Sequence, residues 1–127
     1  ELKDIISKRM KITEEYYANY LDKLKTKDYR KASELLWGII NNLFSIIKIL
    51  YVGEPVKKHS EIREIANTLF KKEEIAELVI ACERLHSNFF HGFMDEEEFE
   101  RERIKAEKLI KILEKFIIEE MIKRKLI

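Results

Sequence analysis

The chain has 127 residues, a length that suits one domain, so we expect a single domain over residues 1–127. Its 25 basic and 24 acidic side chains nearly cancel, which argues against a protein that coats nucleic acid by charge alone. Cys82 is the only cysteine, so an internal disulfide and a cysteine-rich zinc module are excluded, and a reducing, cytoplasmic setting is expected.

Apolar residues recur at helical spacing in the first half of the chain, and no stretch alternates apolar and polar residues as a strand would. The pattern predicts a helix over residues 2–25 and another over residues 29–51. In the first, Ile5, Ile6, Met10, Tyr17, Tyr20, Leu21 and Leu24 recur at helical spacing. The second is apolar on more than half of its circumference and should be central. Asn41, Asn42 and Lys48 interrupt its apolar run, so we expect a buried helix and no membrane span.

A loop with Gly53 and Pro55 is the one clear break in the helical pattern. After this loop, Ser60 is predicted to cap the N-terminus of a short helix that reaches Leu69.

The last third of the chain predicts two more helices. One covers residues 73–92, with Gly92 at the position that commonly ends a helix. Asp95 and Glu98 resemble a capping box and begin a long helix whose end carries the cations of residues 123–125. The predicted fold is therefore all-α: an antiparallel up-and-down four-helix bundle with one additional short helix.

The helix over residues 73–92 carries an unusual polar stripe. Arg84 and His91 are seven residues apart, which on an α-helix is about 20° short of two turns, and Ser87 and Asn88 fall between them. One interpretation is catalytic: Arg84 binds an anion, His91 transfers a proton, Asn88 orients them, and Ser87 and His86 support them. The other is structural: Arg84 pairs with a carboxylate on another helix, and Asn88 and His91 satisfy buried backbone groups.

Metal ligands are insufficient in the sequence. Glu83 and His86 form one Glu-x-x-His pair, whereas a di-iron bundle needs two such pairs and two further glutamates. Cys82, His86 and His91 are spread around the helix and cannot share one zinc ion. We therefore expect neither a metal nor a cofactor.

Two segments resemble a known family. Asp-Tyr-Arg-Lys-Ala-Ser-Glu-Leu-Leu-Trp-Gly (28–38) is similar to the second-helix signature of the archaeal PaREP proteins. His59, a short helix and then Leu-His-Ser-Asn-Phe-Phe (85–90) are similar to the later signature of that family. The PaREP proteins are a branch of the HEPN superfamily, so the resemblance implies a small helical bundle that forms a homodimer.

The resemblance also implies a chemistry. Many HEPN proteins cleave RNA without a metal, using an Arg followed by a His, and Arg84 and His91 match the loose form of this motif. His91 would then move a proton at the ribose 2′-OH or the leaving oxygen, and Arg84 would stabilise charge on the phosphate.

The competing hypothesis is a non-catalytic helical interaction module. It would bind a partner protein, such as a nucleotidyltransferase encoded nearby in a toxin–antitoxin pair, or a nucleotide. Under either hypothesis, the abundance of Lys and Glu and the absence of Gln favour a microbial protein from a hot environment.

Overall fold

Every regular element of the structure, a computed structural model that describes residues 1–127, is a helix. Four long helices and a short one follow in the predicted order, which confirms the all-α class. They are α1 (Leu2–Lys25), α2 (Tyr29–Val52), α3 (His59–Ile65), α4 (Glu73–His91) and α5 (Glu96–Lys123), and the π-helical turn η1 (Ala66–Phe70) directly follows α3.

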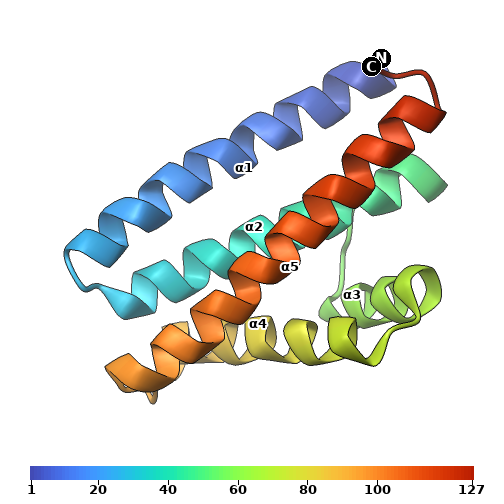
Figure 1. Ribbon diagram of the computed structural model, residues 1–127. Coiled ribbons are helices and arrows are strands. Elements are labelled where there is room, and N and C mark those ends of the chain that lie inside the picture. The colour runs from blue at the N-terminus through green and yellow to red at the C-terminus, as the bar shows by residue number, and fades with distance from the viewer.

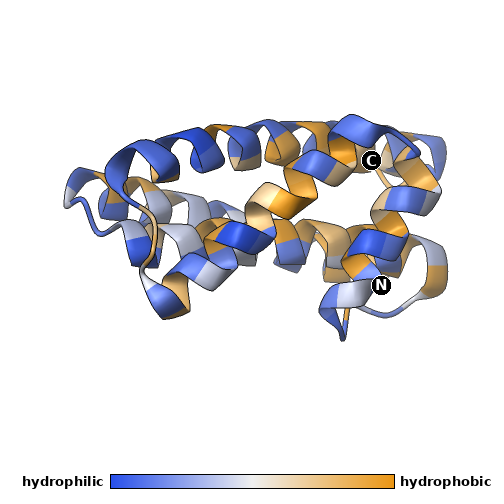
Figure 2. Ribbon diagram, turned by 90° about the horizontal axis from the view of Figure 1, so that it is seen from below, coloured by the Kyte–Doolittle hydropathy of each residue, from blue (hydrophilic) through white to orange (hydrophobic).

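Helix α2 is the centre of the molecule. It packs against α1, α4 and α5, and α4 and α5 also pack against each other (Figure 1). Figure 2 shows hydrophobic residues on the helix sides that face inward. Helix α2 is long and apolar enough to cross a membrane, but 67% of its apolar window is buried, as in a core helix. The predicted central position of this helix is confirmed.

Helix α1 buries only part of its apolar surface. Ile6 and Tyr20 are fully buried, whereas Ile5, Tyr17 and Leu21 keep 44%, 37% and 42% of their surface exposed. The predicted helix is confirmed, but helical spacing of its apolar residues does not mean that all of them are buried. Because α1 packs mainly against α2, only one narrow face of it is covered.

The start of α3 differs from the prediction. Ser60 lies inside the helix, which begins at His59. The Glu61 carboxylate accepts hydrogen bonds from the backbone N–H groups of Lys57 and Lys58, at 3.2 and 2.9 Å. Glu61 therefore reaches back over the start of the helix, and this satisfies N–H groups that the predicted Ser60 cap does not.

The other predicted helix ends are found. Helix α4 ends at His91, and Gly92 follows in the left-handed conformation, with φ 59°. Asp95 caps α5, because its carboxylate accepts a hydrogen bond from the backbone N–H of Glu98 at 2.8 Å. Lys123 lies in the last turn of α5, where the helix dipole favours a cation.

Candidate acid–base site

Arg84 is bound by carboxylates of α5. Its guanidinium lies 3.2 Å from Glu102 and 3.6 Å from Glu98, and it is also over the Phe93 ring, 5.7 Å from the ring centroid. Glu102 is 5% exposed, so this ion pair is shielded from solvent on one side. The positive charge of Arg84 is thus largely balanced within the chain, and the contact ties α4 to α5.

Asn88 is also fully engaged. It is 1% exposed, its amide N–H donates to the Ser33 hydroxyl at 3.2 Å, and its carbonyl accepts from the backbone N–H of Met94 at 2.9 Å. Ser33 in turn donates to the carbonyl of Tyr29 at 2.7 Å. Asn88 therefore joins α4 to α2 and to the turn before α5.

His91 lies apart from these contacts. It is the last residue of α4, it is exposed, and its ring makes no hydrogen bond or ion pair within the chain. Ser87 is half-buried, and its hydroxyl likewise has no partner in the chain. The structure thus gives Arg84 and Asn88 separate partners on α5 and α2, and no interaction joins either side chain to His91.

His86, in contrast, belongs to a group of side chains from three helices. Its Nδ1 atom lies 2.8 Å from Oε1 of Glu34 on α2, and its ring stacks on Trp37, with centroids 4.8 Å apart and planes at 20°. The His59 ring of α3 meets His86 edge to face at 5.1 Å and meets Trp37 edge to face at the same distance. We call Glu34, Trp37, His59 and His86 the imidazole cluster.

The imidazole cluster is open to solvent on one side. The side chains of His86 and Glu34 are 22% and 34% exposed, and His59 is exposed, whereas Trp37 is 5% exposed and forms the base. Phe90, which is 57% exposed, closes another side with its ring 5.2 Å from that of His86. His59 is therefore open to solvent, and His86 is partly open.

The chemistry of the cluster follows from its partners. With Nδ1 donating to the Glu34 carboxylate, neutral His86 keeps a lone pair on Nε2. His59 supplies a second imidazole beside it. No group of three or more His, Cys, Asp or Glu side chains is arranged to hold a metal ion. The arrangement can therefore accept a proton at one imidazole and donate one from the other.

The sequence predicted His86 as a supporting residue only, and it did not place Glu34, Trp37 or His59 in a catalytic site. The four residues lie in the segments that carry the PaREP resemblance, residues 28–38, His59 and residues 85–90. Glu34 and Trp37 are also one helical turn apart, which places them on one face of α2. Their common location in these segments was the sequence feature that could have identified the four residues as one group.

The fold and this surface cluster define a small all-helical protein with a solvent-accessible pair of imidazoles. The model of the archaeal PaREP1/PaREP8 family matches residues 8–110, and the chain belongs to this family. The predicted family is thereby confirmed. No curated protein and no solved structure matches the chain significantly.

Proposed function

We propose that this protein is a metal-independent ribonuclease that performs acid–base catalysis at the imidazole cluster. The observation that carries the proposal is the hydrogen bond of 2.8 Å between Glu34 and His86, with a second imidazole, His59, in ring contact. Exposed lysines adjoin the cluster in the sequence: Lys31 is one turn before Glu34, and Lys58 precedes His59. Neither lysine makes an ion pair within the chain, so both ammonium groups are free for phosphates.

The proposed reaction needs two proton transfers. Nε2 of His86 takes the proton of a ribose 2′-OH, and the 2′ oxygen attacks the adjacent phosphorus. The bond from phosphorus to the 5′ oxygen breaks, and protonated His59 gives its proton to that oxygen. The products are a 2′,3′-cyclic phosphate and a 5′-hydroxyl end, and the two histidines exchange protonation states.

The Arg84/His91 pair is the competing arrangement for the same reaction. The HEPN resemblance favours it, whereas the two carboxylates on Arg84 oppose it, because they compete with a phosphate for the guanidinium. Both versions of the proposal also include two further features. The four long helices pack in the antiparallel HEPN-like arrangement, and the protein is located in the cytoplasm.

A cleavage assay on single-stranded RNA, with a chelator present, tests the proposal. His86→Ala and His59→Ala should each lower the rate at least about 100-fold, since general acid–base groups contribute that much. Glu34→Gln should lower the rate while leaving the RNA affinity near that of wild type. Thermal melting of each variant identifies losses that come from unfolding.

Three outcomes of this cleavage assay would argue against catalysis at the imidazole cluster. If His91→Ala and Arg84→Ala abolish cleavage while the His59 and His86 variants cleave normally, the Arg84/His91 pair carries the reaction. If all four variants cleave as wild type does, the activity belongs to a contaminant. If folded wild type leaves RNA intact, the ribonuclease proposal is wrong.

The second candidate is an interaction module, and an exposed apolar face of α1 beside α2 favours it. Ile5, Ile12 and Tyr16 lie within about 20° of one line along this helix, and they are 44%, 40% and 37% exposed. We propose that a second copy of the chain covers this face. Ile12 and Tyr16 share a surface depression with Trp37, so the dimer would bring two imidazole clusters near one interface.

Sedimentation measurements test the dimer. Ile12→Glu should weaken dimerisation about tenfold or more, because it buries a charge in an apolar contact, whereas Ile118→Glu, at an exposed site on α5, should not. If wild type is a monomer at all concentrations, the dimer proposal is wrong. The exposed face of α1 would then be a binding site for a different protein, such as a nucleotidyltransferase.

A further inference from the structure

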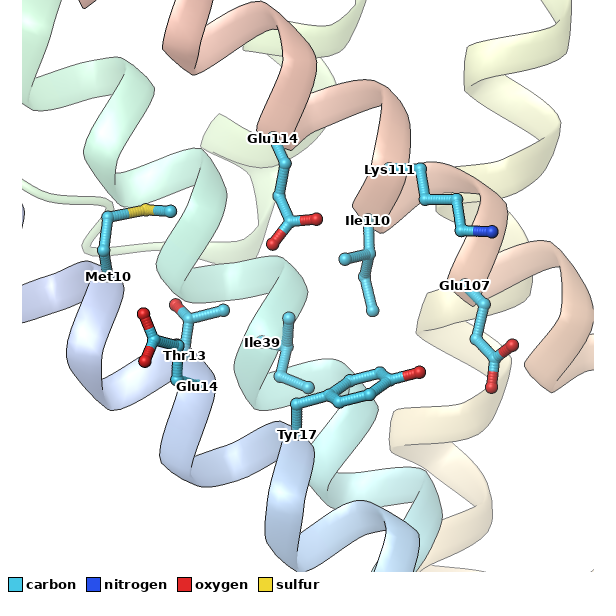
Figure 3. A pocket seen from close by; sticks show the side chains of 9 residues that line it. All are labelled: Met10, Thr13, Glu14, Tyr17, Ile39, Glu107, Ile110, Lys111 and Glu114. Atoms are coloured by element: carbon cyan, nitrogen blue, oxygen red, sulfur yellow. The ribbon is translucent and has the colours of Figure 1, made fainter.

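A cavity of about 340 Å³ lies between α1 and α5, and none of its lining residues belongs to the imidazole cluster. The two helices both pack on α2 but scarcely on each other, so α2 forms the base of the space between them. Ile39 of α2, Ile110 of α5 and Met10 of α1 give it an apolar floor (Figure 3). This volume is within the range of small-molecule sites.

The walls of the cavity are acidic. Glu114 of α5 points into the space between the helices, Glu14 of α1 lies at its edge with its carboxylate on the Met10 side, and Lys111 points away from both (Figure 3). Neither Glu14 nor Glu114 makes a hydrogen bond or ion pair within the chain. Glu107 lies farther along the cavity and is already held by Tyr20 and Arg103.

The two unpaired carboxylates differ in their surroundings. Glu14 is exposed, whereas Glu114 is half-buried, and burial raises the pKa of its carboxyl group. No cation of the chain compensates for that burial. A cationic ligand would therefore find at Glu114 a carboxylate that has lost part of its hydration and lacks a partner.

We propose that this cavity binds an aliphatic polyamine, an organic cation whose ammonium groups are separated by methylene chains. Its ammonium groups would pair with Glu14 and Glu114, and its methylene chains would cover Ile39 and Ile110. The Tyr17 ring at the rim offers a face to an ammonium group. Acidic walls above an apolar floor suit a polyamine better than an inorganic cation, because an inorganic cation has no methylene groups to pack on the apolar surface.

Calorimetric titration of the full chain with spermidine tests the site. Wild type should bind one molecule saturably, and Glu14→Gln and Glu114→Gln should each weaken binding about tenfold or more, as expected when a charged hydrogen bond is lost. Glu119→Gln is the matched control, since Glu119 is an exposed residue of α5 without an ion pair. It removes the same charge and should leave the affinity unchanged.

The result that overturns the proposal is equal binding by all four proteins, because that would be a diffuse counterion effect. The absence of saturable binding to wild type would overturn it too. If spermidine does not bind and the Glu14→Gln, Glu114→Gln double variant shifts the sedimentation of the protein, a second copy occupies the cavity instead. None of these outcomes depends on RNA cleavage, so the polyamine site and the ribonuclease proposal fail separately.

Discussion

At the scale of single residues, Asn42 is the polar group on which the α1–α2 contact depends most. It is 7% exposed, and its carbonyl accepts a hydrogen bond from the Arg9 guanidinium at 2.8 Å. Its amide donates to the Arg9 carbonyl at 2.7 Å and to the Thr13 hydroxyl at 2.8 Å. We predict that Asn42→Ala lowers the free energy of unfolding by about 1–3 kcal/mol, because it leaves buried groups unpaired. Urea denaturation measures this loss.

Asn41→Ala is the control for that prediction. Asn41 is the next residue on α2, it is half-buried, and its side chain makes no hydrogen bond within the chain. Its replacement should change the free energy of unfolding by no more than about 0.5 kcal/mol. Equal losses in the two variants would mean that the buried hydrogen bonds do not contribute.

The partners of single side chains could not be predicted from the sequence. Helical spacing placed Arg84, Asn88 and His91 on one face, but it could not identify the helix that meets each of them. That depends on how each helix is rotated about its axis, which tertiary packing decides. Glu34 and His86 are 52 residues apart in sequence, and only the packing of α2 against α4 brings them together.

At the scale of helices, the end of α4 shows how a local turn and a distant side chain combine. Gly92 has φ 59°, and Arg30 of α2 donates to the carbonyls of Phe89 and Phe90, at 3.0 and 2.9 Å. A Cβ at position 92 would lie 3.2 Å from the Cδ atom of Arg30. Gly92→Ala therefore adds a displacement of Arg30 to the backbone strain.

We predict that Gly92→Ala destabilises the protein more than Gly53→Ala does. Both glycines have positive φ, so alanine should cost about 1–2 kcal/mol at either position. No atom lies within 4 Å of a Cβ built at Gly53, whereas at Gly92 the weakened Arg30 bonds should add about 1 kcal/mol. The difference in urea midpoint between the two variants measures the contribution of Arg30, and identical midpoints would refute it.

The helices themselves were predictable because their signals are local. Gly92 and Asp95 act through their own backbone neighbours, so their roles as helix ends were visible in the sequence. The prediction for α1 was less complete, since apolar spacing identifies a helix but does not say how many neighbours cover it. The start of α3 was misplaced because Glu61 caps it from inside the helix.

At the scale of the whole molecule, ion pairs between elements make stability depend on pH. Glu61 illustrates the effect: the ammonium group of Lys48 on α2, 2.5 Å away, lowers the pKa of its carboxyl group, and the backbone N–H groups of Lys58 and Lys57 lower it further. Nearby cations also lower the pKa of three other carboxyl groups, those of Glu54, Glu74 and Glu100.

A carboxyl group whose pKa is lower in the folded state stabilises the fold above its unfolded pKa, and this stabilisation is lost as the pH falls through the folded pKa. The melting temperature of wild type should therefore fall as the pH decreases from about 5. Glu61→Gln should melt below wild type at pH 7, and the gap should close in acid, because the lost interaction is one that protonation removes anyway. Glu64→Gln, at an exposed and unpaired site on the same helix, should follow the wild-type profile. Melting curves recorded from neutral to acidic pH would contradict this account if the gap between Glu61→Gln and wild type stayed constant.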